Sequence, residues 1–331
     1  MAHVVNFSQG KFDLIYKDIE DILKESDLSF ANLEAPVDDS LPYSAYPEFN
    51  MHHDYPDAAI KAGFNVFSLA NNHTNDKGKN SIAATKKYFD SKQNVYSNGL
   101  CSKKGEEPRP TLIEKNGWKI LFLAVTEVMN YKTNTDLFYY VSPAKESREK
   151  FLNHISKLRK ENPCDLFVLS IHCHDEEYVR TINPAQRDFY LKLLNSGADV
   201  VWANHPHVAK GWEVIADENR VPRKIIFHAQ GNTISGQRQE VEFDNPDAKR
   251  AYTGEGFITQ VTFKKDEGVK IAQVNPHLIT TYILPDWHFV IKKLNDSFLN
   301  ELKKEGRNTW AKYLSERKKR MDKIEGKLIW Q

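Results

Sequence analysis

The chain has 331 residues, of which 40% are hydrophobic and 27% are charged, and this is enough for one large core with an appendage. Its 46 basic and 45 acidic residues nearly cancel, so bulk charge gives no reason to expect binding to nucleic acid or to an acidic polymer. Three cysteines without the spacing of metal ligands argue against a disulfide framework and against a cysteine zinc site.

The first two-thirds of the chain alternates between helix patterns and strand patterns. Helices are indicated by apolar residues three and four positions apart, with Gly63 and Gly197 as stop signals and Pro184 in a first turn. Short apolar runs between turn residues indicate strands. The predicted helices cover 14–23, 58–62, 82–89, 151–158 and 184–194, and the predicted strands cover 28–34, 65–70, 119–125, 165–171, 199–203 and 225–228. This alternation predicts an α/β fold with a largely parallel sheet.

The character of the sequence changes after Thr253. Segments 257–263 and 269–274 alternate around a turn at 266–268, which predicts an antiparallel hairpin. From Val290 onward the pattern is helical and charged. We therefore expect residues 1–285 to form the main domain and residues 286–331 to form a C-terminal helical extension.

Polar side chains follow five of the predicted strands. Ligands of such sheets gather outside the carboxyl ends of the strands, so we expect these side chains to face one pocket. Neutral imidazoles with carboxylate or amide oxygens are what a pair of borderline divalent cations requires. The candidate metal ligands are Glu34, Asn72, His172, His205 and His207.

The pair His205 and His207 is the most specific part of this pattern. An extended His-x-His sends both rings to the same side, so that each reaches one of two neighbouring ions. The alternative is a solvated turn with two incidental histidines.

The other candidates also have alternatives. Asn72 and His73 combine an amide ligand with an imidazole that can protonate a leaving group, although by themselves they indicate only a loop. His172 closes an apolar strand, whereas His174 is equally well an exposed loop residue. Glu34 is either a ligand that bridges two ions or a carboxylate that caps a neighbouring helix, and we favour the ligand.

These segments resemble the ordered motifs of bacterial capsule-synthesis proteins of the CapA type, which are associated with poly-γ-glutamate. The resemblance extends from near residue 1 to about residue 260 and rests on 32–36, 62–76, 197–208 and 231–232. It departs at 172–174, where the family has His-Trp-Gly and this chain has His-Cys-His. The resemblance implies a calcineurin-like metallophosphatase fold with α/β/β/α layers and a metal pair at the strand ends.

The resemblance also implies roles for the candidate residues. Glu34 would bridge two divalent ions, which would be Mn, Fe or Zn. One ion would be held by Asn72, His172 and His205, and the other would be held in part by His207. His73 would protonate the leaving oxygen while water activated by the metal attacks phosphorus or another electrophile.

One departure concerns the opening of the family pattern, a strand that ends in Gly-Asp and supplies a metal-binding carboxylate. No Gly-Asp precedes Glu34, and Met1-Ala2-His3 is similar to the tail of such an opening. We therefore expect a strand encoded upstream of Met1, with His3 as a further metal ligand. Without that carboxylate, we expect one tightly bound ion and a weak second ion.

The leading hypothesis is a metal-dependent hydrolase that acts on a phosphoester or on a cell-envelope substrate related to poly-γ-glutamate. The alternative is a non-catalytic accessory factor of capsule or envelope polymer biosynthesis or export, with a degraded metal site. A nucleotide-binding protein is disfavoured because no Gly-rich phosphate loop follows a strand.

Partners and location follow from the same reasoning. The expected partners are the substrate and capsule-synthesis membrane proteins, but not nucleic acid. The sequence has no run of roughly 18 apolar residues and no charged-then-apolar leader, so as written it is expected to be soluble. An upstream signal segment would instead place the protein outside the cytoplasm or at a membrane.

Overall fold

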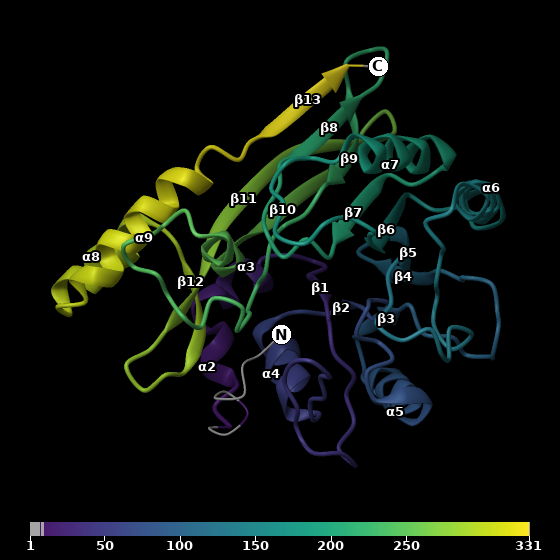
Figure 1. The fold of residues 1–331 in the computed structure, drawn as a ribbon. Helices are drawn as coiled ribbons and strands as arrows, with labels where there is room; N and C mark the ends of the chain where they lie inside the picture. Colours follow the sequence, from purple (N-terminus) through teal and green to yellow (C-terminus); the bar gives the residue numbers. More distant parts are fainter. Residues whose placement is uncertain (1–6, 8–9, 331) are drawn as a thin grey trace.

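The computed structural model describes residue 7 and residues 10–330 (Figure 1). Within these residues the strands form three sheets. The largest has seven strands in the order β13-β8-β9-β7-β6-β5-β4, and its centre, from β5 to β9, is parallel. Its strands are β4 (Thr111–Lys115), β5 (Trp118–Thr126), β6 (Leu166–His172), β7 (Val200–Asn204), β8 (Trp212–Ala216), β9 (Pro222–Phe227) and β13 (Gly326–Trp330).

Two smaller sheets form the second strand layer. A parallel sheet contains β1 (Phe30–Asn32), β2 (Val66–Ser68) and β3 (Tyr96–Asn98). An antiparallel sheet contains β10 (Glu255–Lys265), β11 (Val269–Ile283) and β12 (Phe289–Lys293). The predicted hairpin is confirmed as β10 and β11, which pair along the whole of β10 with one irregularity.

Helices cover the outer faces of both strand layers. Four of the predicted helices are confirmed, mostly with ends that extend beyond the sequence patterns, whereas the helix predicted over 14–23 is divided into three short helical segments. Their bounds are α2 (Asp13–Tyr16), η1 (Lys17–Ile19), α3 (Glu20–Lys24), α4 (Asp54–Ala62), α5 (Gly78–Asp90), α6 (Lys145–Glu161) and α7 (Pro184–Ser196), followed by η2 (Lys249–Gly254), α8 (Asp296–Lys304) and α9 (Asn308–Met321).

The side chains of β5 show how the layers stack. Leu121 and Leu123 point to one face and pack in a cluster with α6 and α7. Phe122 and Ala124 point to the other face and pack in a cluster with residues of β1, β2 and β10. Because strand side chains alternate, one strand builds both cores. Helices α2 to α5, α8 and α9 then close the far side, and the expected α/β/β/α layering is confirmed.

The expectation that the chain is helical from Val290 onward is wrong for two segments. β12 pairs antiparallel with β11, and the β-branched Val290 and Ile291 are buried there. β13 pairs parallel with β8, and Figure 1 shows it in yellow beside β8, beyond α8 and α9. These short strands lie next to the charged helical pattern of α8 and α9, so the sequence did not indicate them. The domain boundary at residue 285 stays a prediction.

A cavity of about 610 Å³ lies between β1 and β10, which are edge strands of the two smaller sheets. Residues 26–34 line one side of it, residues 257–263 line another, and its floor includes Val168 and Val200 of the large sheet. The upstream strand that ends in Gly-Asp has no counterpart among the described residues and stays a prediction. Within the described residues, no helix has both the length and the apolar character needed to cross a bilayer.

Buried charges tie α9 to the centre of the fold. Glu255, at the start of β10, is fully buried and accepts hydrogen bonds from Arg317 Nε at 2.9 Å and Nη2 at 2.7 Å. Arg238 pairs with the other oxygen of the same carboxylate. Removing one partner of such a group leaves buried charge without compensation.

We therefore expect Arg317→Ala to lower the free energy of unfolding by about 3–5 kcal/mol. The control is Arg320→Ala on the same helix, because Arg320 pairs with an Asp247 side chain that is 61% exposed. Its loss should change the free energy by about 1 kcal/mol or less. Urea denaturation of the two variants makes the comparison, and equal effects would show that α9 is an appendage.

Candidate metal centre

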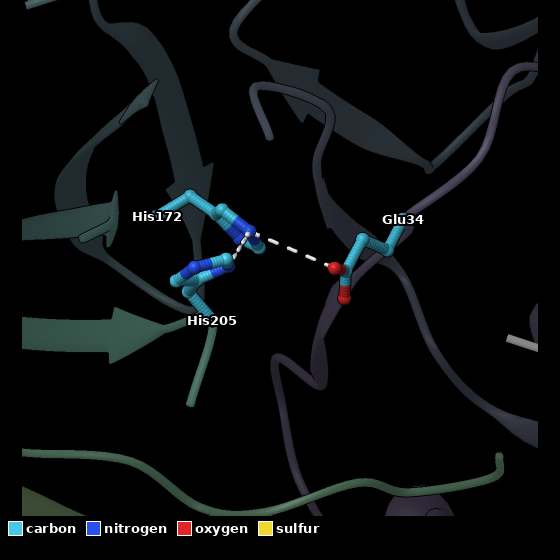
Figure 2. Close-up of side chains that lie close together, drawn as sticks. All are labelled: Glu34, His172 and His205. Carbon is cyan, nitrogen blue, oxygen red and sulfur yellow. Dashed lines mark hydrogen bonds and ion pairs between the residues drawn. The ribbon is translucent and has the colours of Figure 1, made fainter. Parts of the chain in front are cut away.

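The candidate ligands lie where the carboxyl ends of strands from two layers face each other. Glu34 follows β1, Asn72 follows β2, His172 ends β6 and His205 follows β7. β1 and β2 belong to the small parallel sheet, whereas β6 and β7 belong to the large sheet. Figure 2 shows the Glu34 carboxylate on one side, directed toward the two imidazoles on the other. The fold thus brings together residues that are far apart in the sequence.

The Nε2 atom of His172 is the centre of the first cluster. It lies 2.9 Å from Oδ1 of Asn72, 3.2 Å from Nδ1 of His205 and 3.6 Å from Oε1 of Glu34. The amide nitrogen of Asn72 donates to Oδ1 of Asn130 at 3.1 Å, which turns its oxygen toward His172. Two imidazole nitrogens and two side-chain oxygens directed at one place are a suitable donor set for a borderline divalent cation.

The carboxylate of Glu34 gives a direct test of whether a cation fits. Its Oε1 atom is buried and accepts no hydrogen bond from the described residues. It lies 3.6 Å from Nε2 of His172 and 3.6 Å from Nε2 of His207. A buried acceptor left unsatisfied costs about 1–3 kcal/mol, and more when it is charged. A divalent cation between Glu34 and the imidazoles would remove this penalty, so the residues present fit a metal ion.

A second cluster lies on the His207 side of Glu34. Glu177, His205 and His207 each offer a ligand atom within 4.8 Å of the others. Nδ1 of His207 lies 2.9 Å from Oδ1 of Asn232, so that amide orients the ring. Because Glu34 contacts histidines of both clusters, its position suits a carboxylate that bridges two ions.

The backbone at His205 and His207 differs from the sequence argument, which assumed an extended chain. Both residues have positive φ, 108° and 59°, and lie in a bend after β7. Their rings nevertheless meet, with centroids 6.1 Å apart. Such conformations are unfavourable outside glycine and persist where the surrounding structure holds them, often at functional sites. The prediction of an extended backbone at His-x-His is therefore wrong, although the two rings do lie close together.

His73 lies beside the first cluster. Its Nδ1 atom is 2.7 Å from Oδ2 of the buried Asp76, and its ring packs edge-on against Phe49. Asn130 accepts a hydrogen bond from Asn72 and donates one to Asp76, so it links His73 to the ligands. A carboxylate on Nδ1 fixes the tautomer and makes Nε2 the atom for proton exchange.

Burial keeps the imidazoles of His172 and His205 neutral. It lowers the pKa of the fully buried His172 well below its usual value, and the neighbouring His205 and His207 lower it further. Burial also lowers the pKa of His205, against the opposing effect of Glu34. A neutral imidazole has a free lone pair, so both histidines are ready to bind a metal ion at neutral pH.

The segment where this chain departs from His-Trp-Gly is well anchored. The buried Cys173 donates a hydrogen bond from Sγ to the carbonyl oxygen of Asn204 at 3.0 Å. The backbone of His174 donates to Glu127, which also binds Arg148 through both carboxylate oxygens. The His174 side chain is exposed. The departure thus links the loops after β6 and β7 instead of disrupting them.

Sequence reasoning missed three residues of the site. Glu177 groups with His205 and His207 and could hold a metal ion with them, and the acidic run after β6 was the available signal. Asp76 is three residues after His73, a spacing that could have been noticed. Asn130 had no sequence signal because a long loop brings it to Asn72. His3 lies outside the described residues.

The match to a family model described as "Bacterial capsule synthesis protein PGA_cap" covers residues 2–237. The "Capsule biosynthesis protein CapA" of Bacillus anthracis is 27% identical over 243 residues, which cover 68% of this chain and 54% of that protein. The "PGA biosynthesis protein CapA" of Bacillus subtilis (strain 168) is 28% identical over 234 residues, which cover 68% and 57%. The chain thus spans about half the length of these curated relatives.

Among solved structures, a hypothetical protein from Thermus thermophilus aligns with a TM-score of 0.42 and 15% identity. The alignment covers 81% of this chain and 93% of that chain. A TM-score this low supports no inference about function.

The burial of His172 predicts how the stability of the metal-free protein depends on pH. The unfolded chain takes up a proton on His172 below about pH 6.5, whereas the folded chain resists it, so stability falls as pH falls through that value. His172→Gln should reduce this loss by up to about 1.4 kcal/mol per pH unit. Urea denaturation in EDTA at about pH 7.5 and about pH 5.5 measures the loss.

The control is His174→Gln, in the same loop, because the His174 side chain is exposed. This variant should leave the pH dependence as it is in the unsubstituted protein. An unchanged dependence in His172→Gln would contradict the burial argument.

Proposed function

The chain belongs to the bacterial capsule synthesis protein family PGA_cap, and from the geometry of its candidate metal centre we propose that it is a metal-dependent hydrolase. The observation that carries this proposal is the buried Oε1 atom of Glu34, unsatisfied and equidistant from His172 and His207. An arrangement that served only stability would pair or remove this oxygen.

In the proposed site, Glu34 would lie between two divalent ions, which we expect to be Mn, Fe or Zn. Asn72, His172 and His205 would hold one ion, and His207 would help to hold the other together with Glu177. Such ions lower the pKa of bound water and polarise the bond that is attacked. Burial lowers the pKa of His172 and His205 and so keeps their lone pairs free of protons, and Asn232 keeps the His207 ring in place.

His73 is proposed as the general acid. Asp76 holds Nδ1, so Nε2 can carry the proton that a leaving oxygen requires. Asn130 connects Asp76 to Asn72 and sets the distance between the acid and the ligands. This division separates the residue that moves a proton from the residues that bind metal.

The proposed substrate is a phosphoester or a cell-envelope compound related to poly-γ-glutamate. Two relatives are named for capsule or PGA biosynthesis, which supports the envelope setting without identifying the bond that is cleaved. Membrane partners in capsule synthesis and a location outside the cytoplasm stay predictions. The second candidate function, a non-catalytic accessory factor, is favoured by the small number of carboxylates that surround the second cluster.

We expect about one tightly bound ion per chain and a second that is lost on dialysis, because the second cluster has fewer ligands. His205→Ala should abolish the tight ion, whereas Glu177→Gln should remove only the weak one. His174→Ala is the control and should retain both. Metal analysis of protein purified without chelator decides between the outcomes, and no metal at all would favour the accessory factor.

We expect His73→Ala to keep its metal and to lower the hydrolysis rate by about 100-fold with an alkyl phosphodiester. The loss should be smaller with bis(p-nitrophenyl) phosphate, because a p-nitrophenolate leaves without being protonated. Asp76→Asn should show the same selectivity. If the hydrolysis rates of the two substrates fall by the same factor, His73 does not act as the general acid.

A further inference from the structure

A group of positively charged side chains lies beside the second cluster. The ring of Tyr178 stacks near that of His207, with centroids 6.2 Å apart and an interplanar angle of 23°. The Arg250 guanidinium lies 4.3 Å from the centre of the Tyr178 ring, and Nζ of Lys249 lies 5.5 Å from it. Both cations are exposed on η2, and only the Tyr178 ring separates them from His207, a candidate metal ligand.

Tyr178 is held firmly in this position. Its backbone has a φ of 66°, and its N–H donates to the carbonyl oxygen of Pro206 at 2.8 Å, between the two histidines. Its hydroxyl accepts hydrogen bonds from Arg250 at 2.9 Å and from Gln237 at 3.3 Å. The strained residue therefore fixes the place of Arg250 relative to His207.

These two cations lack an ion-pair partner among the described residues. No carboxylate in the described part of the chain forms an ion pair with Lys249 or Arg250, whose contacts are with Tyr178. The nearby Asp247 is already bound by both ends of the Arg320 guanidinium, at 2.7 and 2.8 Å. Glu177, the other nearby acid, groups with His205 and His207 and hydrogen-bonds the Tyr178 hydroxyl, but it forms no ion pair with Lys249 or Arg250 within the described residues. Two cations are therefore available to an incoming anion.

We propose that Lys249, Arg250 and Tyr178 form a subsite for an oxyanion of the substrate, next to the His207 side of the metal centre. Arginine binds a carboxylate or phosphate through two parallel hydrogen bonds, and the lysine adds a mobile positive charge. The tyrosine ring keeps both cations in place through cation–π contacts. The inference rests on the proposed function, because it places this anion beside the bond that reacts.

The shared chemistry of the ligand is an oxyanion, and two sources can supply it. A γ-linked glutamate chain carries one free carboxylate per residue, whereas a diphosphate carries a second phosphate next to the first. Isothermal titration with penta-γ-glutamate and with inorganic pyrophosphate separates these sources. Each titration is made with EDTA-treated protein and with Mn-loaded protein, so that loss of metal and loss of the subsite are read separately.

The test variant is K249Q/R250Q, and the matched control is K157Q/K160Q. The control removes two exposed cations from α6, which lies on the opposite face of the large sheet. We expect the test variant to bind one of the two probes about tenfold more weakly with its metal content unchanged, and the control to bind as the unsubstituted protein does. The affected probe identifies carboxylate or phosphate as the source.

Three results would overturn the proposal. The first is that neither probe binds the unsubstituted protein, and the second is an affinity that K249Q/R250Q leaves unchanged. The third is an equal loss in K157Q/K160Q, which would mean that only overall charge matters. Tyr178→Phe keeps the ring but removes the hydroxyl that Arg250 contacts, so it should weaken binding by a smaller factor. A protein that binds no metal but still binds the anion would refute the proposed hydrolase and leave the subsite standing.

Discussion

The arrangement of this protein depends on one buried carboxylate that needs a positive partner. Glu34 stands at the end of a strand in one layer and directs an unsatisfied oxygen toward imidazoles held by the other layer. Burial lowers the pKa of His172 and of His205, so neither of these two imidazoles carries a charge that would balance the carboxylate at neutral pH. A cation between them would resolve this conflict, and the two-layer fold is what holds the opposing groups a few ångströms apart.

The support of this centre reaches far along the chain. Asn232, which orients His207, donates to the carbonyl oxygen of Thr253 at 2.9 Å, just before Glu255. Gly231 has a φ of 73°, and a side chain there would come within 2.6 Å of the carbonyl oxygen of Glu255. Glu255 in turn is fixed by Arg317 of α9. The C-terminal helix thus takes part in positioning a ligand that lies more than a hundred residues before it.

Local patterns explain why much of the fold could be predicted. The apolar runs around β5, β6 and β7 and the polar residues after them determine the sheet and the edge that carries the candidate ligands, because period and strand polarity are local properties. Three features depended on distant contacts instead. β12 and β13 are short and gain their stability from β11 and β8, and the bend at His205 is imposed by neighbouring loops. Asn130 joins the site only through the folded loop that carries it.

Charge balance connects the metal centre with the cations on η2. Glu34 and Glu177 bring two negative charges to the two clusters, whereas two divalent ions would bring four positive charges. Lys249 and Arg250, which form no ion pair in the described part of the chain, add to this excess on the His207 side. An anionic substrate would neutralise both, so we expect the second ion and the substrate to strengthen each other's binding, as linkage requires. The net charge of the whole chain is close to zero and therefore does not indicate a local anion-binding site. One site can be strongly positive while the rest of the surface compensates.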